Sequence, residues 1–373
     1  LVIGTPTAAH PEKTLLSQDE FLAIIGEATK GAGAKYFTPF SVVDEGLLIP
    51  FGKKHYLIDP QTKKQLAAFE RAGRAEQAFA LAPRAKHAVA VRDNNLFLLL
   101  PDGSSKQLTT DGTPTLVYGQ SVHQNEFGIN GGLFWSPDGS RLAFYRMDQR
   151  MVTDYPLVNI DVPSAVRIAQ PAPEKYPMAG MTSHKVTVGI FNPENDRTVW
   201  LDLGDPTDRY FTNLSWSPDG NRLYIMEVPR SQKRCDLVAY DTHTGARLGV
   251  LYTETNERFV EPQNPLTFLP WDKDKFIYQS ERDGFNHLYL FNTKGQLLKQ
   301  LTSGKFEVLE LLGFNTRSHS VIIRSNESGH IRENLYAVDL KTGRRTLLDN
   351  GVGVHRAQLS PNGTLLRDTW SSP

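Results

Sequence analysis

The chain has 373 residues with 41 Lys plus Arg and 41 Asp plus Glu, so its formal net charge at pH 7 is zero. This balance excludes the basic surface of a general nucleic-acid binder and the polybasic anchor that binds anionic membranes. The single cysteine, Cys235, excludes an internal disulfide framework and a multi-cysteine zinc site, and no apolar run approaches the roughly 18 to 20 residues that span a bilayer.

One short helix is predicted near the amino terminus, over residues 18–30. Ser17 is followed three residues later by Glu20, which is the capping-box pattern of a helix start. Apolar residues recur at helical spacing over 21–25, and Gly31 is a suitable stop. Residues 1–35 are therefore assigned to an N-terminal helix and a Gly-Ala linker.

After this region, a repeated turn replaces helical periodicity. Trp-Ser-Pro-Asp-Gly occurs at 135–139 and again at 216–220, and a weaker copy, Leu-Ser-Pro-Asn-Gly, occurs at 359–363. Proline fixes φ and glycine accepts a positive φ, so each copy predicts a tight turn between two strands.

Hairpins form a second repeated unit. A strand pattern that leads into Thr-Gly or Lys-Gly occurs at 236–245, 287–295 and 334–343. Two hairpins per repeat of about 40–50 residues make a four-stranded blade, and this period is typical of a β-propeller. Residues 36–373 are therefore predicted to be all-β: an eight-bladed β-propeller whose last blade is incomplete in this chain. A β-sandwich is the alternative, but sandwiches do not repeat a turn motif at this period. The predicted blades begin near residues 40, 76, 130, 182, 210, 264, 308 and 351.

The common catalytic motifs are missing from the sequence. It has no phosphate loop, no dinucleotide-binding Gly motif and no Gly-x-Ser-x-Gly nucleophile elbow. His123 and Glu126 have a spacing that, on a helix, could place two metal ligands on one face. The segment precedes a predicted strand and no third ligand stands out. We therefore predict no catalytic residue, no metal and no cofactor in this chain.

The segment 122–132 is too polar and Gly-rich to be a buried strand. One interpretation is a solvated loop between two blades. The other is a loop that projects into the mouth of the ring and presents one carboxylate, Glu126. A carboxylate in a partly dry cavity is a good partner for an ammonium group, at about 1.5–3 kcal/mol per charge-assisted hydrogen bond.

Several segments together match one known family. They are 122–128, 134–139, 143–148, 176–180, 213–218, 260–262, 282–289 and 355–361. Many propellers share the Trp-Ser-Pro turn, whereas the Asn-Glu-Phe-Gly loop and the Arg-Asp-Gly-Phe-Asn-His-Leu-Tyr run are specific. Over about residues 36–373, the chain resembles the propeller domain of the dipeptidyl peptidase IV branch of the prolyl oligopeptidase family, and is most similar to bacterial prolyl tripeptidyl aminopeptidases.

The resemblance implies a division of labour between two domains. The propeller caps a C-terminal α/β-hydrolase domain, absent from this chain, that carries the Ser, Asp and His triad. The loop before blade three holds the free amino terminus of the substrate, and the matching residue here is Glu126. Dipeptidyl peptidases carry two adjacent glutamates in this loop, whereas this chain has Asn125 and Glu126. One more substrate residue needs roughly 3.3–3.6 Å more room, so Asn125 favours tripeptide over dipeptide release.

The sequence thus predicts the substrate-gating and amino-terminus-binding propeller of a serine exopeptidase that releases Xaa-Xaa-Pro tripeptides or Xaa-Pro dipeptides. Its expected partners are peptides with a free amino terminus and proline before the scissile bond, its own hydrolase domain and, in full-length form, a second copy. The family implies a periplasmic, secreted or cell-surface location; the chain starts at Leu1 and retains no signal peptide. Alone, this chain should be inactive. The alternative is a stand-alone propeller that serves as a non-catalytic protein-interaction module.

Overall fold

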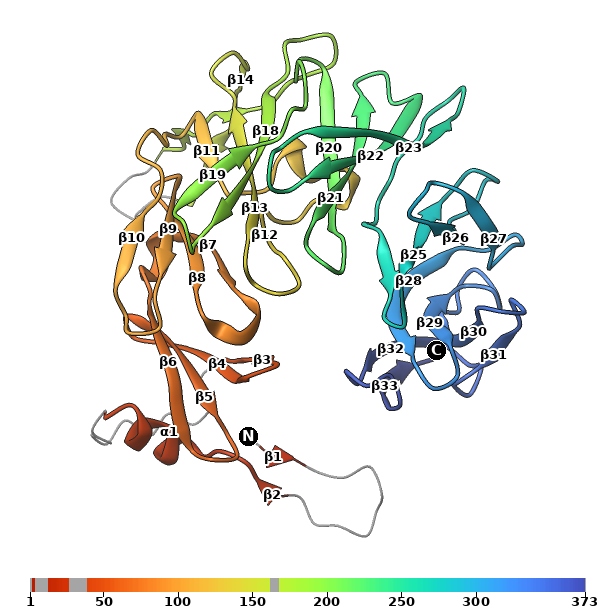
Figure 1. The fold of residues 1–373 in the computed structure, drawn as a ribbon, viewed down its shortest axis with the longest axis horizontal. Coiled ribbons are helices and arrows are strands. Elements are labelled where there is room, and N and C mark those ends of the chain that lie inside the picture. The colour runs from red at the N-terminus through yellow and green to blue at the C-terminus, as the bar shows by residue number, and fades with distance from the viewer. Residues whose placement is uncertain (1, 4–12, 27–38, 162–167, 373) are drawn as a thin grey trace. The chain divides into compact units, whose positions relative to one another are not determined.

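The structure is a computed structural model, drawn in Figure 1 with its ribbon coloured by residue number. Its residues divide into two compact units. The first unit comprises Leu1–Val122 and Gly131–Thr198, and the second comprises His123–Asn130 and Val199–Pro373. The short segment His123–Asn130 therefore belongs to the second unit, although the chain on both sides of it belongs to the first. The described residues are 2–3, 13–26, 39–161 and 168–372.

The amino-terminal helix begins where the capping box predicts. In α1 (Gln18–Ile24), the Oγ atom of Ser17 accepts the backbone N–H of Glu20 at 3.1 Å. The Glu20 carboxylate in turn accepts the backbone N–H of Ser17 at 2.8 Å. Phe21 is fully buried in an apolar cluster with strands of the first sheet. The helix is thus fixed at its start by the cap and along one face by Phe21.

The helix ends earlier than predicted. Its last residue is Ile24, whereas the sequence pattern placed the end near residue 30. Gly26 adopts a φ of +73°, the left-handed conformation that commonly terminates helices. The rest of the predicted helix, residues 27–30, and the Gly-Ala linker lie outside the described residues.

Two four-stranded antiparallel meanders form the first part of the first unit. Consecutive strands are neighbours in both, so each sheet is built from local hairpins. The first sheet contains β3 (Ser41–Val43), β4 (Gly46–Phe51), β5 (Lys54–Asp59) and β6 (Lys64–Glu70). The second contains β7 (Glu76–Leu81), β8 (Ala88–Arg92), β9 (Asn95–Leu99) and β10 (Ser105–Gln107). Smaller elements of this unit are β1 (Val2–Ile3), β2 (Lys13–Thr14), η1 (Gly73–Ala75) and η2 (Pro83–Ala85).

The third sheet differs from the prediction. β18 (Lys185–Asn192) pairs with β13 (Leu142–Asp148) along the whole of β13. The strand near residue 182 therefore extends the sheet of the blade predicted to begin near residue 130, and does not start another blade. The reason is an insertion between the two strands, which breaks the repeat spacing. The first strand of this sheet also lies earlier than predicted, at residues 116–118. The remaining strands of this sheet are β11 (Leu116–Tyr118), β12 (Leu133–Trp135) and β19 (Arg197–Trp200).

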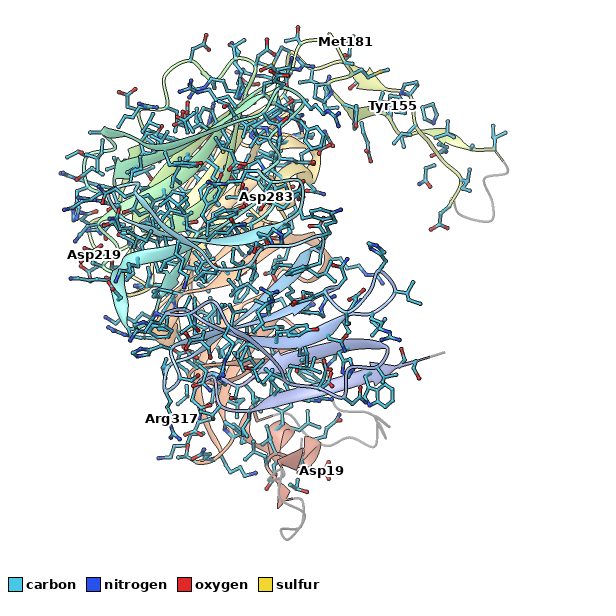
Figure 2. The ribbon with its side chains drawn as sticks, turned by 90° about the vertical axis from the view of Figure 1, so that its right-hand side faces the viewer. Asp19, Tyr155, Met181, Asp219, Asp283 and Arg317 are labelled. Atoms are coloured by element: carbon cyan, nitrogen blue, oxygen red, sulfur yellow. The ribbon has the colours of Figure 1, made fainter. Side chains whose placement is uncertain are left out.

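The insertion between β13 and β18 forms an arm of short paired strands. Tyr155 and Met181 are labelled on it in Figure 2. Exposed apolar side chains recur along this arm, and among its described residues, 149–161 and 168–184, no apolar cluster like those of the sheets is formed. Its strands are β14 (Asp154–Tyr155) with β17 (Glu174–Lys175), and β15 (Val158–Asn159) with β16 (Gln170–Pro171).

The described part of the second unit holds three four-stranded antiparallel meanders and a final two-stranded hairpin. The first meander contains β20 (Arg209–Trp216), β21 (Arg222–Pro229), β22 (Arg234–Asp241) and β23 (Arg247–Thr255). The second contains β24 (Thr267–Leu269), β25 (Asp272–Ser280), β26 (His287–Asn292) and β27 (Leu297–Gln300). The third contains β28 (Val308–Asn315), β29 (Ser320–Ser325), β30 (Asn334–Asp339) and β31 (Arg345–Leu347). The hairpin is β32 (Val354–Leu359) with β33 (Leu366–Ser371).

The repeated turn motif forms the predicted turns. In the first copy, Ser136 donates its hydroxyl to Asp138 at 2.6 Å, and Gly139 has a φ of +70°. In the second copy, Ser217 donates to Asp219 at the same distance. The weaker copy also closes, because the N–H of Gly363 reaches the Ser360 carbonyl at 2.8 Å. The serine and the glycine thus stabilise the same turn at each site.

The all-β prediction is confirmed. Among the described residues, the only helices are α1 and three short 3-10 helices, and the remaining regular elements are strands. The successive four-stranded antiparallel sheets are consistent with propeller blades. Within the same residues, the model contains no helix with the length and apolar character needed to cross a bilayer.

Candidate functional site

Glu126 lies on the segment η3 (His123–Gly128), a distorted 3-10 turn that we call the Glu126 loop. Its backbone is unusual because four non-Gly residues have a positive φ: 54° at His123, 55° at Gln124, 62° at Asn125 and 57° at Phe127. The left-handed region costs a residue that carries a Cβ atom roughly 1–2 kcal/mol. The loop can keep this shape only if contacts at its ends compensate for the strain.

His123 anchors the beginning of the loop. Its side chain is buried, with the residue 1% exposed. The Nε2 atom accepts a hydrogen bond from the backbone N–H of Phe211, in β20, at 3.2 Å. The imidazole also lies edge-on to the ring of Tyr210, with the ring centroids 5.0 Å apart. One buried side chain thus ties the loop to two consecutive residues of β20.

Phe127 anchors the other end. It is 1% exposed and belongs to an apolar cluster of the second unit, together with Tyr224, Phe276 and Phe291. Its ring also lies 5.0 Å from that of Tyr210. His123 and Phe127 therefore hold Tyr210 from two sides, and the loop closes over this ring.

Three exposed residues, Gln124, Asn125 and Glu126, lie between the two anchors. The backbone carbonyl of Glu126 accepts the N–H of Ile129 at 3.1 Å, which fixes the chain after the carboxylate. No described side chain forms a hydrogen bond or an ion pair with the Glu126 carboxylate. The loop therefore presents one uncompensated negative charge beside the Asn125 amide.

The electrostatic surroundings of the Tyr210 phenol indicate where the Glu126 carboxylate lies. Burial raises the pKa of the Tyr210 phenol, Arg230 opposes that shift, and the Glu126 carboxylate adds to it. Glu126 is thus close enough to Tyr210 to act on it electrostatically. Arg230 pairs with Asp208 at 2.9 Å. A cation that approached Glu126 would therefore meet an arginine whose charge is already compensated.

A carboxylate-lined pocket of about 220 Å³ lies in the same unit. Glu254, Glu261 and Glu281 line it together with apolar residues that include Phe259 and Val260. Burial raises the pKa of the Glu281 carboxyl, and the neighbouring carboxylates of Glu307, Glu261 and Glu254 raise it further. Within this pocket, Ser280 donates to Glu254 at 2.7 Å.

The metal interpretation of His123 and Glu126 finds no support in the geometry. The Nε2 atom of His123 faces a backbone N–H group, and Glu126 is exposed. In the part of the chain that the structure describes, no group of three or more His, Cys, Asp or Glu residues is arranged to hold a metal ion.

Sequence reasoning proposed Glu126 and Asn125 as site residues but missed what holds them. It considered His123 only as a possible metal ligand, and it treated the tyrosines as core residues. The contact between His123 and Phe211 joins residues that are far apart in the chain, so no local pattern could indicate it. The run of polar residues without an obvious strand pattern was the only available signal of an unusual loop.

Comparison with known proteins identifies one family. The family model described as "Dipeptidyl peptidase IV (DPP IV) N-terminal region" matches residues 50–373. A protein named "Probable dipeptidyl-aminopeptidase B" from Coccidioides posadasii (strain C735) is 30% identical over 253 residues, which are 61% of this chain and 27% of that protein. The protein of the same name from Pyrenophora teres f. teres (strain 0-1) is 27% identical over 353 residues, which are 86% of this chain and 38% of that protein.

Two solved structures are also similar. A Bacteroides ovatus ATCC 8483 protein assigned as a dipeptidyl aminopeptidase IV superimposes with a TM-score of 0.82 at 38% identity, over 96% of this chain and 52% of that one. Porphyromonas gingivalis dipeptidyl peptidase 4 gives a TM-score of 0.77 at 24% identity, over 96% of this chain and 51% of that one, and this match concerns the fold alone. The chain therefore spans about half the length of these two structures and a smaller part of the curated relatives.

Proposed function

The chain belongs to the dipeptidyl peptidase IV N-terminal region family, and from this membership we propose that it is the substrate-gating and amino-terminus-binding propeller of a serine exopeptidase. The propeller occupies residues 36–373, after an N-terminal helix and linker at 1–35. It admits flexible peptides and binds their free amino termini. A C-terminal α/β-hydrolase domain of the parent protein supplies the catalytic triad.

Glu126 carries this proposal. An exposed carboxylate without an ionic partner, on a backbone held in a strained conformation, is a preorganised site for an ammonium group. Since the strain is already present before the ligand binds, the loop does not have to reorganise. The same carboxylate would repel a peptide carboxyl terminus, which makes the site selective for one end of the substrate.

Asn125 supports tripeptide release in preference to dipeptide release. In place of a second carboxylate it offers a neutral amide, so the ammonium group binds to one anchor, Glu126. The substrate is then an Xaa-Xaa-Pro peptide, with Xaa-Pro as the alternative. Either substrate is consistent with an exopeptidase whose propeller sets the distance from the bound amino terminus to the scissile bond.

The arm between β13 and β18 supports association of two copies of the full-length protein. Three of its apolar residues are strongly exposed: Val158 at 62%, Ile160 at 83% and Ile168 at 77%. Burying such a row against a second copy removes apolar surface from water, at about 25 cal/mol per Å². We further propose a periplasmic, secreted or cell-surface location, where free peptides are available.

Glu126→Gln in the full-length protein tests the function. We expect kcat/KM for Xaa-Xaa-Pro and Xaa-Pro reporters to fall by a factor of roughly 30 to 1000, which is about 2–4 kcal/mol. An unchanged value would contradict the amine-anchor role. Sequencing the native gene past the codon for Pro373 tests the parent enzyme, because a downstream Gly-x-Ser-x-Gly, Asp and His are expected. A nearby stop codon would instead favour a non-catalytic interaction module.

A further inference from the structure

We propose that His123 is a positioning residue for the amine anchor: its Nε2 atom, as a hydrogen-bond acceptor, holds the Glu126 loop in the conformation that presents the carboxylate. This inference rests on the proposed function of Glu126. It concerns a residue that does not itself reach the substrate, because His123 is 1% exposed. It assigns the specificity of the site to a buried contact rather than to a further charged group.

The hydrogen bond to Phe211 has a definite direction. The backbone N–H of Phe211 can only donate, so the Nε2 atom of His123 accepts and carries no proton in this arrangement. β20 is the edge strand of its sheet, whose strand order is β20-β21-β22-β23. An N–H group that points away from an edge strand has no partner in the ladder. His123 supplies that partner from outside the sheet.

The strain in the loop makes this acceptor important. Residues 123, 124 and 125 adopt a positive φ in succession, immediately before Glu126. The contact to Phe211 and the packing on Tyr210 both hold His123 in its left-handed conformation, so loss of the acceptor removes one of the contacts that fix this end of the loop. The following residues can then relax toward ordinary backbone conformations. Glu126 would still be exposed and charged, but its carboxylate would be spread over several positions.

β20 also contacts the segment that follows β23, which approaches the end of the loop at Gly128. The side-chain amide of Asn213 donates to the carbonyl of Pro262 at 2.8 Å. Phe211 and Asn213 lie next to a register shift in β20, between Thr212 and Ser215. The same irregular stretch of one strand therefore holds both the Glu126 loop and the segment that contains Pro262. This arrangement explains why an acceptor at His123 sets the position of Glu126 relative to its surroundings.

A pair of substitutions separates acceptor chemistry from packing. In His123→Gln, the side-chain oxygen can occupy the place of Nε2 and accept from Phe211. In His123→Asn, the shorter side chain carries the same amide but cannot reach it. The measured quantity is the preference of the full-length enzyme for a free-amine reporter peptide over its N-acetylated form, as a ratio of kcat/KM values. We expect His123→Gln to keep this preference within about threefold and His123→Asn to lower it by at least about tenfold, chiefly through KM.

His287→Asn is the matched control. His287 is also fully buried in the second unit, and its ring contacts Thr302 at 3.1 Å and Gly304 at 3.0 Å, neither of which belongs to the Glu126 loop. This variant should lower the melting temperature and leave the free-amine preference unchanged. Equal preferences in His123→Gln and His123→Asn would overturn the proposal, as would a loss of preference in His287→Asn as large as in His123→Asn.

Glu126→Gln distinguishes the two levels of the argument. If Glu126→Gln abolishes the preference and His123→Asn does not affect it, the amine anchor stands and the positioning role fails. If Glu126→Gln leaves the preference intact, the proposed function itself fails. In the double variant, His123→Asn should have little further effect once Glu126 is neutral, because both changes act through the same carboxylate.

Discussion

Gly128 lies so close to Gln263 that a Cβ atom on Gly128 would come within 2.2 Å of the Gln263 carbonyl oxygen. This contact is between two backbones, so no side-chain rotation can relieve it. Gly128 also has a φ of +69°. Space and conformation therefore both require glycine where the Glu126 loop ends, and the loop is seated directly against the segment that follows β23.

Gly128→Ala should consequently displace the loop. We expect a loss of roughly 2–4 kcal/mol in the free energy of unfolding, from the left-handed backbone and the forced separation together. The free-amine preference should fall with it. Thermal denaturation and reporter kinetics on the full-length protein measure the two effects. Gly131→Ala is the control, because a Cβ atom there would meet nothing within 4 Å; comparable losses in both variants would refute this account.

Asn125→Glu should shift cleavage from tripeptides toward dipeptides. A second carboxylate beside Glu126 gives the ammonium group an additional anchor and shortens the accessible distance to the scissile bond. We expect the ratio of kcat/KM for Xaa-Pro over Xaa-Xaa-Pro reporters to rise about tenfold, or about 1.4 kcal/mol. Asn125→Gln has the same length without the charge and controls for strain, since position 125 has a φ of 62°. If Asn125→Glu and Asn125→Gln change this kcat/KM ratio equally, the added charge is not the cause.

Asp219 should contribute stability that disappears in acid. The hydroxyl of Ser217 is the main cause that lowers the pKa of Asp219 from 3.8, and the backbone N–H of Asn221 lowers it further. Since the folded-state pKa lies below the unfolded value, the stabilisation is complete above about pH 3.8 and is lost as the pH falls through the folded-state pKa. Asp219→Asn should therefore destabilise the chain by about 0.5–1 kcal/mol at neutral pH.

Melting curves of the two proteins at pH 7 and near pH 3 check this prediction, because the difference between them should narrow in acid. The side chain is exposed at a turn, so the substitution should not disturb folding otherwise. A difference that stays constant with pH would show that the charge of Asp219 plays no part.

Replacing exposed apolar residues of the arm with charged ones should weaken self-association of the full-length protein. Ile160→Asp combined with Ile168→Asp should raise the dimer dissociation constant of the full-length protein by at least about tenfold, which is about 1.4 kcal/mol. Sedimentation velocity over a concentration series measures it. Ile331→Asp is the control, because Ile331 is 82% exposed but lies on the second unit. If the unsubstituted full-length protein is monomeric, the proposed dimer is disproved.

Local patterns predicted local structure well. The Trp-Ser-Pro-Asp-Gly turns depend on a proline, a glycine and a serine within five positions, and the capping box depends on Ser17 and Glu20. Such contacts repeat wherever the residues repeat. The end of α1 was placed too late because helical spacing continues past Ile24, whereas Gly26 turns the chain.

Contacts between distant residues could not be predicted in this way. Glu126 was proposed because its neighbours resemble a known loop, but the shape of that loop depends on Phe211 and Gln263, which carry no motif. The pairing of β18 with β13 was also missed, because the arm between them hides the spacing. Backbone contacts of this kind become visible only in the folded structure.

Phe127 has a consequence for how the chain is synthesised. The Glu126 loop leaves the ribosome early, within a stretch that otherwise belongs to the first unit. Its anchoring cluster includes Phe276 and Phe291, which emerge much later. During translation, the apolar ring of Phe127 therefore cannot be buried in this complete cluster until most of the chain has emerged. The segment that presents the proposed amine anchor is thus among the last parts of its neighbourhood to take shape, and interrupted translation products would expose it to chaperones and proteases.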